Sequence, residues 1–291
     1  MYIQDIPILY INLKRDVKRR AILEKDLTSI NAKFKRIDAV YGKDLYNSTY
    51  RKDLAKKLGV SEKKLSPDFW LNRKNFKTMD NKKNSVLAKV GCYLSHLLAY
   101  KTALRLGYTK VLILEDDAMP LRNAFKSFSI PNNADIFYLG GGYFHNDNNN
   151  NNNNNNNTFT TKDLRINIDT DVLKICCTFA YVVPNVNNIK SLYNLFMSVF
   201  KEGGGHDKTD DWKNNTTRLR AQAADFMLIN FVQKAGRTYI QNPPMVSCRE
   251  FASNIADNRQ KYKLSYFLND AQQYKMIGHR GLYNGLYKLL D

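Results

Sequence analysis

The feature that most constrains the fold is segment 111–117, in which four apolar residues run directly into three acidic ones. The run Val-Leu-Ile-Leu is typical of a strand that is buried on both faces in the sheet of an α/β protein. Burying three like charges would cost several kcal/mol each, so Glu115, Asp116 and Asp117 must lie in a cleft and face a cation. In an open α/β sheet, this cleft lies just beyond the carboxyl ends of the strands.

Side-chain alternation along an extended segment predicts how the three carboxylates divide between the faces of the sheet. Glu115 and Asp117 are expected on one face, and Asp116 on the other. This arrangement suits a hard divalent ion such as Mg²⁺ or Mn²⁺, with phosphate oxygens of a substrate as further ligands. An acidic loop or a helix cap that follows a core strand is the structural alternative.

Length and composition indicate one large α/β domain, with room for a small appendage. The chain has 291 residues, of which 43% are hydrophobic, and this is enough for a packed core. No window approaches the roughly 18 apolar residues of a membrane span, and the amino terminus lacks the pattern of a signal peptide. We therefore expect a cytoplasmic protein. The ten-Asn run over 148–157 is a compositional hint of an AT-rich genome, such as that of a large DNA virus.

The formal net charge of +18 indicates a surface that attracts polyanions. Nucleic acid, anionic lipid and nucleotide-sugar diphosphates are the anionic partners that such a surface could bind. The chain shows no helix-turn-helix, zinc finger or aromatic RNA-binding signature, so a nucleic-acid partner is disfavoured. The four cysteines lack the paired spacing of a metal site, and we interpret them as small core residues in a reducing compartment.

Hydrophobic periodicity predicts strands that alternate with helices, which is typical of a mainly parallel sheet flanked by helices. Strands are expected over 6–13, 34–40, 111–114, 135–142, 172–183 and 238–240. Helices are expected over about 14–30, 91–106, 187–200 and 221–235. The ten-Asn run is too polar to pack and is predicted to be a disordered loop within about 146–158.

Several motifs along the chain occur in the order seen in one known family. They are 10–20, 36–42, 91–96, 114–117 and 178–181, followed by Asp225, the pair 243–244 and segment 253–255. In this order and spacing, residues 6–256 resemble glycosyltransferase family 25, which includes lipooligosaccharide and collagen galactosyltransferases. Any one of these motifs is weak by itself, whereas four in the correct order are specific.

The resemblance implies a GT-A fold, which is Rossmann-like, over residues 1–257, with 258–291 as a basic helical tail packed on it. It also implies a hexose, with galactose or glucose expected, carried by a UDP-sugar donor. Mn²⁺ or Mg²⁺ would serve as the cofactor. Transfer would proceed with inversion to a hydroxyl of a glycan or glycoprotein acceptor.

Within this resemblance, Asp117 is the first choice for a direct metal ligand. Glu115 would contact the metal or the ribose, and Asp116 has the same two options. The residues expected to bind the donor nucleotide and its phosphates follow the first strand, and they are Asn12, Arg15, Arg19 and Arg20.

Further candidates each have a structural alternative. Ser95 and His96 would orient the carboxylates or bind phosphate, or they are packing residues of a helix. His206 would be a late metal ligand or a loop histidine. Asp225 would be the general base or only a helix cap, and Asp211 competes with it for the role of base.

Two other classes of function remain open from the sequence. A non-catalytic homologue would bind only a glycan or a partner protein, and the intact carboxylates of 115–117 argue against it. A metal-dependent nucleic-acid phosphotransferase or nuclease would use the same carboxylates together with the basic surface. The sequence argues against this class, because it shows no obvious second acidic cluster that would complete a two-metal site.

Overall fold

The structure is a computed structural model, and it describes most of the chain between residues 1 and 249. The described ranges are 1–71, 83–140, 142–145, 173–176, 178–201, 224–233, 237–241 and 245–249. The predicted Asn-rich loop, the boundary at 257 and the tail 258–291 lie outside the described residues.

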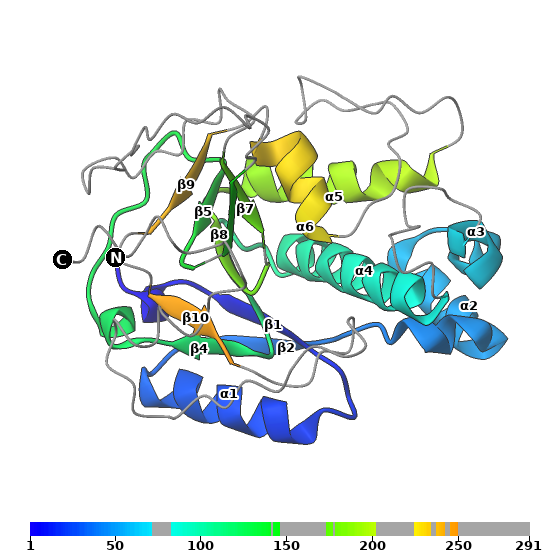
Figure 1. The fold of residues 1–291 in the computed structure, drawn as a ribbon, viewed down its shortest axis with the longest axis horizontal. Coiled ribbons are helices and arrows are strands. Elements are labelled where there is room, and N and C mark those ends of the chain that lie inside the picture. The colour runs from blue at the N-terminus through cyan, green and yellow to red at the C-terminus, as the bar shows by residue number, and fades with distance from the viewer. Residues whose placement is uncertain are drawn as a thin grey trace, which may run out of the picture.

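A six-stranded sheet forms the centre of the protein (Figure 1). Its spatial order is β2 (Phe34–Asp38), β1 (Ile8–Asn12), β3 (Val111–Glu115), β8 (Ala180–Val183), β5 (Ile136–Tyr138) and β9 (Thr238–Ile240). β1 pairs in parallel with β2 and β3, and β5 pairs in parallel with β9. Only β8 runs antiparallel to its neighbours β3 and β5 in this sheet. The predicted mainly parallel α/β sheet is therefore confirmed.

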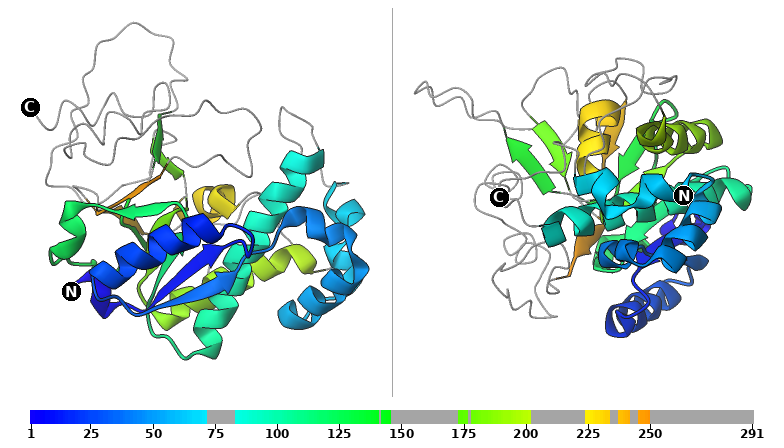
Figure 2. Two further views of the ribbon diagram at one scale, coloured as in Figure 1. Left: turned by 90° about the horizontal axis from the view of Figure 1, so that it is seen from below. Right: turned by 90° about the vertical axis from the view of Figure 1, so that its right-hand side faces the viewer.

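Helices cover both faces of the sheet, because alternate side chains of the central strands enter two different cores. Leu9 and Ile11 belong to the core beneath α4 (Lys83–Arg105) and α5 (Val186–Met197). Ile8 and Tyr10 belong to the core beneath α1 (Val17–Ser29). In the right-hand view of Figure 2, α1 lies at the bottom of the molecule and α5 at the top. Among the described residues, no helix combines the length and the apolar character that crossing a membrane requires.

The prediction of one strand over 172–183 was wrong. The run divides into β7 (Leu173–Cys176) and β8, and β7 pairs with β6 (Gly142–His145) in a separate two-stranded sheet. Both halves are mostly apolar, so hydropathy does not mark the break. A further two-stranded sheet, β4 (Ala118–Pro120) with β10 (Val246–Cys248), follows the acidic segment and has no counterpart in the prediction.

The predicted start of a helix near Gly91 was also wrong, because α4 begins at Lys83 and Gly91 lies inside it. A Cβ atom at Gly91 would lie 2.4 Å from the carbonyl oxygen of Val40. A Cβ atom at Gly42, in the short helix after β2, would lie 1.8 Å from the carbonyl oxygen of Leu87. The two glycines thus allow α4 to pack with its backbone directly against the chain that leaves β2. Helices α2 (Ser48–Leu58) and α3 (Pro67–Leu71) complete this side of the protein.

Candidate functional site

The acidic segment lies at the carboxyl end of β3, beside the carboxyl end of β1. β1 and β3 are adjacent and parallel, and Ile11 of β1 is in register with Glu115 of β3. Asn12 ends β1, and Asp116 and Asp117 form the turn that follows β3. Side chains from both strand ends therefore meet at one edge of the sheet, where α/β folds bind their ligands.

Asp116 points to the α1 side of the sheet, where two protein donors occupy its oxygens. Asn12 Nδ2 donates to Asp116 Oδ2 at 2.8 Å, and Arg19 Nη1 donates to Asp116 Oδ1 at 2.8 Å. Burial raises the pKa of Asp116, and the Arg19 guanidinium opposes that rise. Of the residues predicted to bind the nucleotide, Asn12 and Arg19 therefore contact the acidic segment and link α1 to β3.

Arg19 is the cation that balances the buried charge of Asp116. Replacing Arg19 with Met keeps much of the side-chain length and removes the charge. We expect a loss of about 3 kcal/mol in the free energy of unfolding, because Asp116 would remain buried without its counter-ion. Urea unfolding measures this change. Arg20→Met, at the next position of α1, is the control and should change the free energy by less than about 1 kcal/mol. Equal effects of the two substitutions would contradict the assignment.

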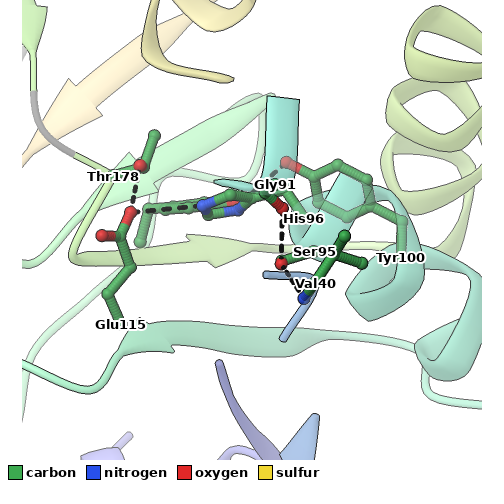
Figure 3. Close-up of polar contacts among 8 residues, drawn as sticks. Val40, Gly91, Ser95, His96, Tyr100, Glu115 and Thr178 are labelled. Carbon is green, nitrogen blue, oxygen red and sulfur yellow. Dashed lines mark hydrogen bonds and ion pairs between the residues drawn. The ribbon is translucent and has the colours of Figure 1, made fainter. Parts of the chain in front are cut away.

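Glu115 points to the opposite face, toward α4, as the alternation predicted (Figure 3). His96 Nε2 lies 3.2 Å from Glu115 Oε1, and the Thr178 hydroxyl donates to the same oxygen. Burial acts to raise the pKa of Glu115, but the hydrogen bonds and charge of His96 and the hydrogen bond of Thr178 lower it overall. Glu115 is therefore held as a carboxylate.

Two buried tyrosines hold His96 on the side of the ring away from Glu115. His96 Nδ1 lies 2.8 Å from the Tyr181 hydroxyl, which lies 2.6 Å from the Tyr100 hydroxyl. Sequence reasoning assigned no role to either tyrosine or to Thr178. Tyr100 is four residues after His96 on α4, and this spacing places the two on one helix face. Thr178 and Tyr181 reach the site because β8 pairs with β3.

Ser95, the neighbour of His96, has a different environment. Its hydroxyl accepts a hydrogen bond from the backbone nitrogen of Val40 at 2.9 Å and donates to the carbonyl oxygen of Gly91 at 2.7 Å. Ser95 is 1% exposed. The structure therefore gives Ser95 a packing role, which joins α4 to the end of β2, in place of the expected contact with the carboxylates or phosphate.

Asp117 is the carboxylate with the least compensation. Its Oδ1 atom is buried and has no hydrogen-bond partner among the described residues. Burial, together with the charges of Glu115 and Asp116, raises the pKa of Asp117 to about 8. A buried carboxylate oxygen without a donor, beside two further carboxylates, is an environment that a divalent cation would stabilise. The donor set fits a hard ion such as Mg²⁺ or Mn²⁺.

Asp225 lies in the short helix α6 (Ala224–Met227), which packs against α4. Burial raises the pKa of the Cys92 thiol on α4, and the charges of Glu115, Asp225 and Asp117 raise it further. The charges of all three carboxylates therefore act on this part of α4. The predicted metal ligand His206 and the competing base Asp211 lie outside the described residues.

The two remaining arginines differ in their surroundings. Arg15 follows β1, and its guanidinium carbon lies 3.7 Å from the centre of the Tyr41 ring, which follows the neighbouring strand β2. This cation–π pair is at the carboxyl edge of the sheet. Arg20 instead influences the pKa of Tyr10. Burial and Glu24 raise that pKa, and the charges of Arg36 and Arg20 oppose the rise.

Together, the sheet and its edge define a Rossmann-like α/β protein with a cluster of carboxylates at the carboxyl ends of its strands. Residues 5–200 match the family model for glycosyltransferase family 25 (LPS biosynthesis protein). The match spans more than half of the 291 residues, and the chain belongs to glycosyltransferase family 25. Family membership supports glycosyltransferase activity in general. A comparison with curated proteins gives no match. Asp225 and the motifs at 243–255 lie beyond the matched residues.

Proposed function

We propose that the chain is a metal-dependent, inverting glycosyltransferase with a GT-A fold. It moves a hexose, galactose or glucose, from a UDP-sugar to a hydroxyl of a glycan or glycoprotein acceptor. The observation that carries the proposal is the buried, unpartnered Oδ1 atom of Asp117 beside Glu115 and Asp116. Such a group at the carboxyl edge of a parallel sheet needs a cation, and a nucleotide-sugar donor brings its phosphates to one.

In this proposal Asp117 holds the Mn²⁺ or Mg²⁺ ion, with Glu115 as the neighbouring carboxylate. When bound, the ion stabilises the negative charge that grows on the diphosphate leaving group. His96 and Thr178 keep Glu115 ionised and oriented. Asp116 holds α1 in place through Asn12 and Arg19. Positioning of this kind lowers the reorganisation that the reaction requires.

Arg15 and Tyr41 are proposed to bind the nucleotide part of the donor. Their stacked pair follows β1 and β2, so it lies at the same edge of the sheet as the carboxylates. An aromatic face can stack on a base, and a guanidinium can pair with phosphate. Asp225 is proposed as the general base, since its charge acts on the same part of α4 as those of Glu115 and Asp117, and inversion needs a base at the acceptor hydroxyl.

The test is release of UDP from a panel of UDP-sugars, with Mn²⁺ and with EDTA. We expect slow release from one hexose donor that requires the metal, and acceleration when a glycan acceptor is supplied. Calorimetric titration of UDP with Mn²⁺ is the companion measurement. Absence of both release and binding would contradict the proposal and favour a non-catalytic homologue. Salt-sensitive RNA or DNA binding that UDP-sugars do not displace would favour a nucleic-acid enzyme.

Metal affinity is expected to depend on pH through Asp117. Because burial and its acidic neighbours raise the pKa of Asp117 to about 8, the carboxyl group is protonated at lower pH and the ion must displace that proton. The affinity for Mg²⁺ should therefore fall about tenfold for each pH unit below 8. Calorimetry at pH 6 and pH 8, with buffers of different ionisation enthalpy, also measures the released proton. An affinity that is the same at both pH values would contradict this expectation.

A further inference from the structure

A second group of possible ligands lies on the α4 side of the acidic segment. Cys92 and His96 are four residues apart on α4, so they share one face of the helix. Glu115 reaches the same point from the end of β3. The Cys92 Sγ atom, an imidazole nitrogen of His96 and a carboxylate oxygen of Glu115 all lie within 4.8 Å of one another.

The chemistry of these three atoms differs from that of the carboxylate turn. A thiolate, an imidazole and a carboxylate form the mixed sulfur, nitrogen and oxygen set that Zn²⁺ prefers, whereas Mg²⁺ and Mn²⁺ prefer oxygen alone. Bond lengths of about 2.0–2.3 Å place the ligands of a tetrahedral zinc ion roughly 3.5 Å apart. The three ligand atoms would therefore have to move closer together when the ion binds.

Both His96 and Glu115 are already held by further hydrogen bonds, as metal ligands usually are. His96 is 1% exposed, and its Nδ1 atom is engaged by the Tyr181 hydroxyl. Its Nε2 atom lies 3.2 Å from Glu115 Oε1 and forms a hydrogen bond with it, so a bound cation would replace the proton between these two atoms. Thr178 fixes the carboxylate from the other side.

We propose that Cys92, His96 and Glu115 form a Zn²⁺ site that is separate from Asp117 and inhibits the enzyme. Cys92 is a free cysteine of intermediate exposure, and its thiol would release its proton on binding the ion. The bound ion would take Glu115 from the donor site and would repel a second divalent ion at Asp117. Inhibition rests on the proposed function, whereas ion binding does not.

Cd²⁺ is the probe for binding, because a thiolate bound to Cd²⁺ gives a charge-transfer absorption in the ultraviolet. The metal-free full-length chain is titrated with Cd²⁺ and compared with Cys92→Ser and with Cys248→Ser, a second free cysteine of intermediate exposure in the described part of the chain. We expect the high-affinity absorption to disappear in Cys92→Ser and to remain in Cys248→Ser. His96→Gln should weaken binding at least about tenfold while the absorption stays attainable at high Cd²⁺. An unchanged titration of Cys92→Ser or His96→Gln would overturn the site.

The regulatory part is tested by Zn²⁺ inhibition of UDP release in excess Mn²⁺. We expect Cys92→Ser to need at least about tenfold more Zn²⁺ for half-inhibition, and Cys248→Ser to behave as the unmodified chain. Equal sensitivity of all three proteins would overturn the inhibitory role. Failure of the proposed function would appear differently, as no UDP release in Mn²⁺ without any Zn²⁺. The Cd²⁺ titration needs no donor and would then decide the site alone.

Discussion

Replacing Asp117 with Asn is expected to reduce sugar transfer by about 10³-fold or more, because several kcal/mol of charge stabilisation would be lost. Asn keeps the size of the side chain and removes the charge that would hold the cation. The buried Oδ1 atom of Asp117 has no hydrogen-bond partner in the described part of the chain, and the Arg19 charge offsets only part of the effect of burial and of the neighbouring carboxylates. Steady-state UDP release with saturating Mn²⁺ and donor measures the change.

The same substitution is expected to stabilise the fold. The pKa of Asp117 is raised from 3.8 to about 8, so the folded protein holds the proton that the unfolded chain releases. Folding stability that this group contributes at low pH is therefore lost as pH rises toward 8. Asn avoids the loss, and the metal-free variant should melt about 2–4 °C higher than the unmodified protein at pH 8, with the difference shrinking toward pH 5.

Asp53→Asn is the matched control for both measurements. Asp53 is an exposed residue of α2, far along the chain from the acidic turn. Its neutralisation should leave both the turnover and the melting temperature unchanged within error. Full activity of Asp117→Asn would show that the acidic turn does not hold the cation, and lower thermal stability would show that the buried charge is compensated.

A large effect on the fold is expected from Gly91→Ala. The new methyl group would lie 2.4 Å from the Val40 carbonyl oxygen and 2.9 Å from the Gly42 nitrogen. These are backbone atoms, so no side-chain rotation can remove the overlap, and α4 must move away from β2. We expect a loss on the order of 3–5 kcal/mol in the free energy of unfolding, which corresponds to a melting temperature lower by about 10 °C.

Gly107→Ala is the comparison variant that distinguishes steric overlap of the new methyl group from backbone strain. Gly107 has a φ of +68°, and a Cβ atom there would meet nothing within 4 Å. Its substitution should lower the free energy of unfolding by only about 1 kcal/mol, because alanine is disfavoured in the left-handed conformation. Urea unfolding of both variants gives the comparison. If Gly91→Ala were no more destabilising than Gly107→Ala, close backbone packing of α4 would not be the reason for glycine at this position.

The sequence was sufficient to predict the placement of two of the carboxylates. An apolar run that leads into acidic residues predicts a buried strand with its charges at the carboxyl end, and alternation then separates Glu115 from Asp116. The structure confirms that Glu115 faces α4 and Asp116 faces α1. These results depend on local geometry alone, namely the two-residue period of a strand.

The partners of the carboxylates could not be predicted in the same way. Arg19 reaches Asp116 across 97 positions of sequence, and Thr178 reaches Glu115 across 63. Thr178 is correctly placed only because the run 172–183 breaks and its second half pairs antiparallel with β3. Since that run is mostly apolar on both sides of the break, hydropathy does not distinguish one strand from two, and strand pairing decides the outcome.

The sequence by itself determined the α/β class, the strand that carries the acidic turn and the division of its carboxylates between two faces, because periodicity and the cost of burying charge are local properties. Tertiary structure alone decided that Gly91 lies inside α4, that Ser95 serves packing, and that Cys92 and His96 meet Glu115. These outcomes depend on how closely α4 approaches β2 and β3. That distance is set by backbone contacts between segments far apart in the chain.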